Sequence, residues 1–321
     1  MEDLRDEIIN KIAALAMEAM LFEVSATPKP GLVDRSNCGA HKDMDYFTFM
    51  SSAAALHDSF DKMVRIGWEH RDEDLSQILQ PLRNTGIEAE KKMFQFTKNV
   101  NTHKGMIFTL GILAGCAGWA INKMPLTYEN LSRLSSKLCA GMCEKEYSNL
   151  DKKEHLTKGE RMYLAYGITG ARGEVEHGYK TVGNCSLPVY RKLRDEGVDV
   201  NSALVQTLLN LVAYTCDTNI ISRHDEQTAS FARDCAKQVL KKGGMFTKEG
   251  RKAIENMDKV FIEQYISPGG CADLLAVTHF IYSMETTEFI KYNVHIKGGI
   301  LYDNADYSFG GTDFCHSAGV C

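Results

Sequence analysis

A polar segment near the start of the chain combines basic, acidic and imidazole side chains. It reads TPKPGLVDRSNCGAHKDMD, residues 27–45, and contains Lys29, His41, Asp43 and Asp45. Because prolines and glycines interrupt it, we expect an irregular loop, in which Asp43 and Asp45 can point at one Mg²⁺ ion. The alternative is that Asp43 is the N-cap of the next helix and Asp45 a first-turn acid favoured by the helix dipole.

The motif NTHKG places two basic residues beside a predicted helix start. Its first two residues can cap the helix, and His103 and Lys104 follow at the positive end of the helix dipole. Gly105 allows a ligand to approach the backbone closely, and a helix N-terminus with a nearby lysine is a good phosphate site. The alternative is a capped helix with two solvated basic side chains.

The motif TGARGE begins at Thr169 and ends at Glu174, with Gly170 and Gly173 on either side of Arg172. Its flexible backbone can offer N–H donors, and a guanidinium group can grip a phosphate through two parallel hydrogen bonds. The carboxylate of Glu174 could act as a base. A short glycine-rich motif of this kind can equally be an ordinary turn.

Two later segments also place polar groups next to apolar helices. DTNIISRHDEQ begins at Asp217 and includes Arg223, and its alternative interpretation is a polar helix end followed by a loop. SPGGCADLLA begins at Ser267, and its Gly269 and Gly270 permit unusual backbone angles or tight approach of a ligand. Its alternative interpretation is an ordinary loop and helix start.

Helical periodicity dominates the remainder of the chain, and strand-like alternation is nearly absent. We expect an amphipathic helix over residues 4–24 and a second helix with Asp43 as its N-cap. Further helical patterns occur near residues 72–97, 104–121, 127–144, 158–167, 186–195, 200–215, 226–242, 248–265 and 271–290. The sequence therefore predicts an all-α protein with one large helical domain over residues 1–290. Residues 291–321 lack this period and are predicted to be an extension without an assignable role.

The irregular segments are predicted near residues 27–45, 99–105, 169–183, 217–227 and 267–273. Each combines glycine or proline with charged or hydroxyl side chains, and each adjoins an apolar helix. We therefore expect the helices to bring these segments to a common pocket.

Composition and charge exclude several classes of protein. The 321 residues carry a formal net charge of −5, which argues against general binding to nucleic acid or to a membrane surface. Ten cysteines without a CxxC pair, behind an acidic start rather than a basic and apolar leader, predict reduced thiols in the cytoplasm. The uncharged run over residues 105–122 is predicted to be a buried helix rather than a membrane span. Motifs of serine hydrolases, P-loop proteins and Rossmann folds are absent from the sequence.

Taken together, the five motifs resemble in order and spacing the triphosphoribosyl-dephospho-CoA synthase family. The resemblance covers about residues 10–285. This family makes the prosthetic-group precursor for the acyl carrier proteins of citrate lyase and malonate decarboxylase. The resemblance implies a single all-helical domain and a transferase that moves the 5-triphosphoribosyl group of ATP to the 2′-hydroxyl of 3′-dephospho-CoA, with release of adenine. The chain departs from the family pattern at Cys38, at Cys271 and at His224-Asp225, where the family often has Gly-Gly.

The resemblance also implies roles for individual residues. Glu174 is the expected base for the acceptor hydroxyl, Asp217 a second choice for that role or for stabilising the sugar cation, and His41 the expected proton donor to adenine. Mg²⁺ is expected at Asp43, Asp45 or both, shared with phosphates. The expected substrate-binding residues are Lys29, Gly31, Asn37, His103, Lys104, Gly105, Thr169, Gly170, Arg172, Gly173, Arg223, Ser267, Gly269 and Gly270.

Two other functions stay open at this level. With water as acceptor, the same pocket would make an N-ribosyl hydrolase or phosphohydrolase of nucleotides. Without turnover, it would be a nucleotide-binding module. The resemblance implies that the product is passed on towards an acyl carrier protein, and a homo-oligomer is left open.

Overall fold

Two long helices run through the centre of the fold and carry residues of the candidate site at their first turns. These are α4, Lys104–Ala120, and α14, Gly269–Thr286, which pack against each other. Nearly every residue of α4 is buried. The uncharged run of the sequence is therefore a buried helix, as predicted, because neighbouring helices cover it on all sides.

Glycines let α2, Tyr46–Glu69, cross α4 at very short range. A Cβ atom at Gly118 would overlap the backbone carbonyl of Val64, and one at Gly67 would overlap that of Gly115. Only residues without a side chain allow this backbone contact. The glycine spacing of GILAGCAGWA thus fixes how deeply α2 sits on α4.

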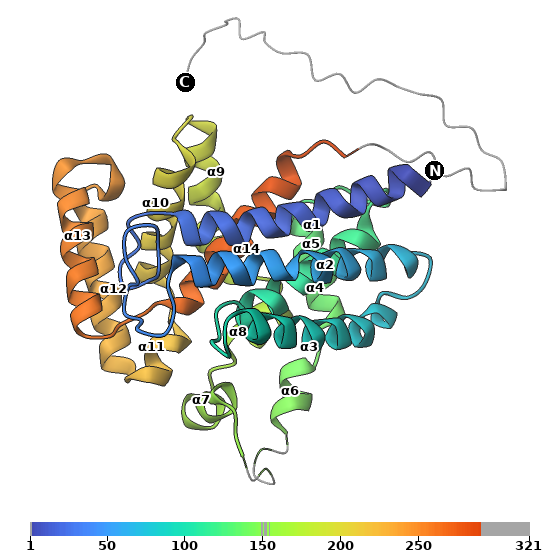
Figure 1. The fold of residues 1–321 in the computed structure, drawn as a ribbon, viewed down its shortest axis with the longest axis horizontal. Helices are drawn as coiled ribbons and strands as arrows, with labels where there is room; N and C mark the ends of the chain where they lie inside the picture. The colour runs from blue at the N-terminus through green and yellow to red at the C-terminus, as the bar shows by residue number, and fades with distance from the viewer. Residues whose placement is uncertain (1, 149, 151–152, 154, 290–321) are drawn as a thin grey trace, which may run out of the picture. The chain divides into compact units, whose positions relative to one another are not determined.

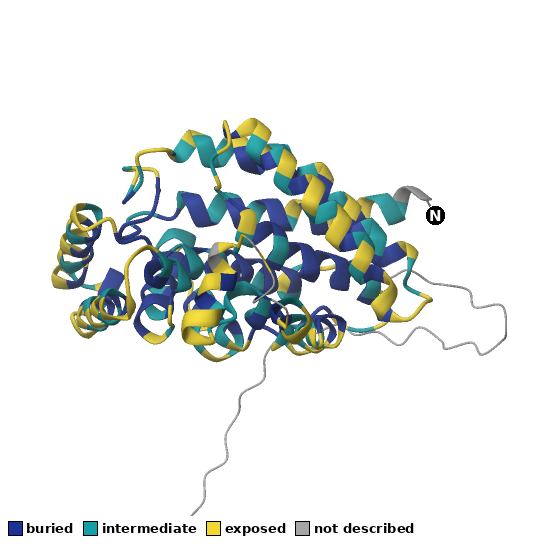
Figure 2. Cartoon of the chain, turned by 90° about the horizontal axis from the view of Figure 1, so that it is seen from below, coloured by how far each residue is buried: buried dark blue, intermediate teal, exposed yellow. Residues whose placement is uncertain are grey.

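The other helices form two groups around this centre (Figure 1). On one side α1 packs on α2, α4 and α14, and α3 packs on α2 and α4. On the other side α10 packs on α9, α12 and α14, and these helices share an apolar core with α13. Figure 2 shows buried residues on the inner helices and exposed residues on the outer faces. The remaining bounds are α1 Glu2–Ser25, η1 Leu75–Ile78, α3 Leu79–Phe96, α5 Tyr128–Leu138, α6 Met142–Tyr147, α7 Lys158–Tyr166, α8 Gly170–Glu176, η3 Val182–Ser186, α9 Leu187–Asp195, α10 Val200–Tyr214, α11 Thr218–Arg223, α12 Glu226–Lys241, η4 Gly244–Phe246 and α13 Lys248–Glu263.

This computed structural model describes residues 2–148, 150, 153 and 155–289. Within those ranges all regular elements are helices and no strand occurs, so the all-α prediction is confirmed. None of the helices there is both long and apolar enough to cross a membrane. The described residues fall within one compact unit, whereas the predicted extension 291–321 lies outside them.

Several predicted boundaries were wrong. Asp45, not Asp43, is the N-cap of α2, because Asp45 has extended backbone and forms a reciprocal capping box with Thr48. The segments expected to be irregular near 169–183 and 217–227 contain the short helices α8 and α11. Their few turns are too short to show helical periodicity in the sequence, and tertiary packing stabilises them instead. The pattern near 127–144 divides into α5 and α6 at Gly141, whose φ of 72° interrupts the helix.

The loop between α1 and α2 is irregular, as predicted, and Asp34 organises it from within. One carboxylate oxygen of Asp34 accepts from Ser36 and from the Asn37 backbone, and the other accepts from the Lys29 backbone at 2.9 Å. The loop is also tied to α13, since Asp258 accepts from the Gly31 backbone and the Asn37 side chain. The loop therefore keeps a defined shape next to the central helices.

Candidate functional site

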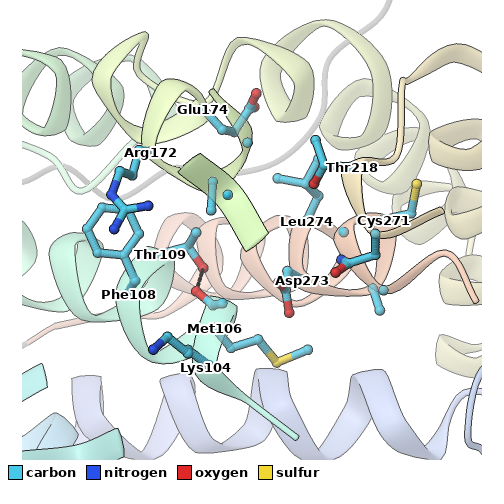
Figure 3. A pocket seen from close by; sticks show the side chains of 18 of the residues that line it. Lys104, Met106, Phe108, Thr109, Arg172, Glu174, Thr218, Cys271, Asp273 and Leu274 are labelled. Atoms are coloured by element: carbon cyan, nitrogen blue, oxygen red, sulfur yellow. Dashed lines mark hydrogen bonds between the residues drawn. The ribbon is translucent and has the colours of Figure 1, made fainter. Parts of the chain in front are cut away.

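The predicted motifs meet at one large cavity of about 1120 Å³. Its walls come from the α1–α2 loop, from α3, from the start of α4, from α6 and α8, and from the starts of α11 and α14. Figure 3 shows this convergence for side chains of α4, α8, α11 and α14. Segments far apart in the sequence thus line one cavity.

Most of the predicted site residues lie on the cavity wall. These are Lys29, His41, Lys104, Gly105, Thr169, Gly170, Arg172, Gly173, Glu174, Asp217, Arg223, Ser267, Gly269 and Gly270. Gly31, Asn37, Asp43, Asp45 and His103 are not part of that wall. Gly31 and Asn37 serve to hold the α1–α2 loop on α13, as described above.

The two predicted metal ligands also point to other partners. Asp45 accepts hydrogen bonds from the Thr48 backbone at 2.8 Å and the Thr48 hydroxyl at 2.7 Å, which lowers the pKa of its carboxyl group. Asp43 is exposed and lies 3.7 Å from His41 Nδ1. Among the described residues, no group of three or more His, Cys, Asp or Glu side chains is arranged to hold a metal ion. Magnesium binding by Asp43 and Asp45 stays a prediction, and their placement gives it no support.

Lys29 reaches the cavity from a buried ion pair. Its ammonium group contacts the carboxylate of Glu23, and both side chains are almost fully buried, at 1% and 2% exposed. Burial raises the pKa of Glu23, while the charge of Lys29 opposes that shift. Lys29 is therefore a fixed positive charge on the cavity wall, already balanced by one carboxylate.

His103 is not the cation that we expected. It is fully buried, its Nδ1 lies 2.7 Å from the Ser52 hydroxyl, and its ring packs edge-on against Phe49. Burial, with the charge of Lys29 adding to it, lowers the pKa of His103 to about 3. The imidazole is neutral at pH 7, so it helps to position the start of α4 instead of binding phosphate.

Carboxylates also form ion pairs with the basic side chains on the part of the cavity wall that α3, α6 and α8 form. Glu146 of α6 accepts from Arg83 at 2.7 Å through one oxygen and from Arg172 at 2.5 Å through the other. Lys104 lies 2.7 Å from Glu90 of α3. An anionic ligand that binds here must therefore draw these cations away from their carboxylates or share them.

The carboxylate of Glu174, the predicted base, is already hydrogen-bonded within the protein. One of its oxygens accepts from the Thr181 backbone at 2.9 Å and the other from the Thr181 hydroxyl at 2.8 Å. Burial raises the pKa of Glu174, and these two hydrogen bonds oppose the shift. The carboxylate therefore ties α8 to the segment that leads into η3.

Asp217 caps two helices at once. One oxygen accepts from the Asn219 and Ile220 backbones at the start of α11, and the other accepts from the Cys271 backbone of α14 at 2.8 Å. Gly270 brings α14 against this carboxylate, since a Cβ atom there would lie 3.1 Å from Asp217 Oδ2. The double glycine therefore allows close packing of two chain segments at the cavity wall.

His41 lies on the wall with its Nε2 2.9 Å from the Ser267 hydroxyl. Burial lowers the pKa of His41, and the positive charge of Arg223 lowers it further, against a smaller opposing effect of Asp43. A lowered pKa leaves the imidazole neutral at pH 7, which favours accepting a proton over donating one. The predicted donor role of His41 stays a prediction.

The sequence interpretation passed over one carboxyl group of the site. Asp273 lines the cavity from the first turns of α14, and the motif SPGGCADLLA predicted its place near the helix start but no role for it. Glu23, Glu90 and Glu146 also line the cavity, yet they lie within helical patterns without any local signal. Only their position in the fold reveals them.

Comparison with known proteins agrees with these motifs. The family model CitG, described as ATP:dephospho-CoA triphosphoribosyl transferase, matches residues 9–290. A "Probable 2-(5''-triphosphoribosyl)-3'-dephosphocoenzyme-A synthase" of Vibrio cholerae serotype O1 (strain M66-2) is 42% identical over 274 residues, covering 85% of this chain and 88% of the relative. A protein with that name in Photobacterium profundum is 40% identical over 275 residues, covering 85% and 87%.

A third relative, from Klebsiella pneumoniae, is named "2-(5''-triphosphoribosyl)-3'-dephosphocoenzyme-A synthase". It is 39% identical over 272 residues, covering 84% of this chain and 90% of the relative. No solved structure matches the chain. The family match over nearly the whole helical unit, with the converging motifs, leads to one conclusion: this chain belongs to the ATP:dephospho-CoA triphosphoribosyl transferase family.

Proposed function

We propose that the cavity is the active site of a triphosphoribosyl-dephospho-CoA synthase. In it, the 5-triphosphoribosyl group of ATP moves to the 2′-hydroxyl of 3′-dephospho-CoA, and adenine leaves. The observation that carries this proposal is the meeting of the family motifs, from the α1–α2 loop to the start of α14, on one cavity wall. Family membership indicates which reaction the protein catalyses, and the cavity indicates where in the structure the substrates bind.

The size of the cavity suits two nucleotides. Pockets for one drug-sized ligand have volumes of about 300–1,000 Å³, and this cavity has about 1120 Å³. Both substrates must bind together, because the acceptor hydroxyl has to lie beside the sugar carbon that adenine leaves. The transfer then becomes a reaction between neighbours held in place, which lowers its barrier through orientation.

The basic side chains of the cavity wall suit anionic substrates. The phosphate groups of such substrates would replace the carboxylates that pair with these side chains. The basic side chains on the wall are Lys29, Arg83, Lys104, Arg172, Lys180 and Arg223. Within the described part of the chain, the side chains of Lys180 and Arg223 make no hydrogen bond or ion pair, so they are available to bind phosphate groups. The other four are held by Glu23, Glu90 and Glu146. Binding of a triphosphate would redistribute these pairs.

Magnesium is proposed to enter with ATP. Mg²⁺ in nucleotide sites keeps several waters and takes one or two carboxylates together with substrate phosphates. The described residues hold no cage for the ion, while single carboxylates do line the cavity, and that donor set fits an ion brought in by phosphates. When bound, it would neutralise phosphate charge next to the basic side chains.

The cellular setting follows from the family and is proposed with it. The product would be passed on towards an acyl carrier protein that carries the finished prosthetic group. We propose a cytoplasmic location, in keeping with the described cysteines, which are all free thiols.

The proposal is tested by following free adenine chromatographically. Purified protein is incubated with ATP and Mg²⁺, with and without 3′-dephospho-CoA, and the coupled product is identified by mass. We expect adenine only when the acceptor is present, in equal amount to the product. Adenine without acceptor would instead indicate a nucleotide N-ribosyl hydrolase, and binding of ATP without adenine would indicate a nucleotide-binding module.

A further inference from the structure

One carboxyl group on the cavity wall differs from all the others there. The described acidic residues of the wall are Glu23, Glu90, Glu146, Glu174, Asp217 and Asp273. The first five have partners, namely the basic side chains, the Thr181 groups and the backbone amides already described. The carboxyl group of Asp273 makes no hydrogen bond or ion pair with any residue that the structure describes. The Asp273 side chain is half-buried on the cavity wall, and a carboxyl group removed in part from water without a partner is costly, a cost that is kept where function needs it.

The fold holds this carboxyl group in a specific place. Asp273 projects from α14 and lies between the start of α4 and Thr218 of α11 (Figure 3). Gly105 of α4 is directly opposite, and a Cβ atom there would overlap the Asp273 carboxylate. The glycine that we predicted to admit a ligand therefore also makes room for Asp273.

The surroundings of Asp273 favour proton transfer. Burial raises the pKa of Asp273 well above its usual value, and the nearby negative charges of Glu23 and Asp217 raise it further. An acid of raised pKa is a stronger proton acceptor when ionised. Asp217 also holds the first turn of α14 through the Cys271 amide, so it positions the helix that carries Asp273.

We propose that Asp273 is the catalytic general base of the transfer, taking the proton of the acceptor 2′-hydroxyl and passing it to the departing adenine. This inference rests on the proposed function. The O–H bond of the acceptor and the bond between the ATP ribose C1′ and adenine N9 break, and the bond from the acceptor oxygen to C1′ forms. The electron pair of the broken glycosidic bond leaves with adenine, which receives the proton that Asp273 has held. No other reactant is required.

The first test replaces the carboxyl group with its neutral isostere. We expect Asp273→Asn to lower the rate of adenine release by about 10²–10⁴-fold, the usual contribution of a general base. ATP binding, measured by calorimetry, should change less than about threefold. The matched control is Asp234→Asn on the exposed surface of α12, which should keep wild-type turnover.

The second test moves the carboxyl group without removing it. Gly105→Ala should displace the Asp273 side chain, and alanine is otherwise better accommodated in a helix than glycine. We expect a loss of turnover in this variant. Combined with Asp273→Asn it should cause little further loss, because two changes that act through one group are not additive.

Three outcomes would overturn the inference. Asp273→Asn could keep turnover within about threefold of wild type, or its turnover could be restored at saturating Mg²⁺, which would make Asp273 a metal ligand. The variant could also melt below the wild type, which would make the side chain a structural one, whereas loss of an unpartnered carboxylate should leave the melting temperature equal or higher. If the wild-type protein itself releases no adenine, the proposed function fails, and that result is separate from these.

Discussion

Glu174 and Asp273 are both acids on the wall of the same cavity, yet the fold uses them differently. Glu174 on α8 is held through both oxygens by Thr181, only seven residues further along the chain. Asp273 on α14 has no such partner among the described residues and faces Gly105 from a distant part of the sequence. In Figure 3 the carboxyl group of Glu174 points away from Asp273. The difference shows that residue type and a place on the cavity wall are not enough to identify a catalytic acid or base. The hydrogen-bond and ion-pair partners of a carboxyl group decide whether it is available for proton transfer.

The largest expected effect separates these two acids directly. Asp273→Asn should reduce turnover by about 10²–10⁴-fold, whereas Glu174→Gln should reduce it by less than about tenfold, because an amide can still bond Thr181. Parallel measurements of adenine release decide between them. If Glu174→Gln loses more turnover than Asp273→Asn, then Glu174, the base predicted from the sequence, is the general base and Asp273 is not.

A second variant removes the carboxylate that joins α11 to α14. Asp217→Ala leaves three backbone amides without their acceptor, which should lower the free energy of unfolding by about 2–3 kcal/mol. Urea denaturation measures this loss, and turnover should fall as well because the start of α14 is displaced. Unchanged stability would show that Asp217 is not the structural cap that its hydrogen bonds indicate.

The pH dependence of the melting temperature should distinguish Asp273, whose carboxyl group has no partner among the described residues, from the paired acids of the cavity wall. Since the folded protein raises the pKa of Asp273, the folded state binds more protons than the unfolded state above pH 4, and this group costs stability as pH rises. The melting temperature of Asp273→Asn should therefore rise increasingly above that of the wild type as the pH increases from the ordinary pKa of an aspartate. Glu23 and Asp217 are its acidic neighbours and are present in both proteins. A difference that shrinks with pH would contradict the raised pKa.

The smallest effects concern the two acids predicted to bind magnesium. Asp45→Ala should lower the free energy of unfolding by about 1 kcal/mol, the typical value of an N-cap. Neither this variant nor Asp43→Asn should change the Mg²⁺ concentration that gives half-maximal turnover. An increase in that concentration of about tenfold in either variant would instead support the metal site predicted from the sequence.

Much of the architecture could be predicted because its causes are local. The uncharged run that forms α4 needs burial whatever surrounds it, and helical periodicity identified most of the long helices. The polar segments of the site were also visible, since proline, glycine and charged residues interrupt those patterns. Boundaries such as Asp45 and the short helices α8 and α11 were missed, because caps and tertiary packing decide them.

The sequence by itself determined that this chain is helical, that it carries the motifs of one family, and which segments line the candidate site. Only the tertiary structure decided which side chains in those segments are available for chemistry. Glu146 joins Arg83 to Arg172 across three helices, His103 turns inward, and Gly105 meets Asp273 from the other central helix. The physical reason is that desolvation and pairing depend on groups far apart in the chain, so the charge and reactivity of a residue are properties of the folded state.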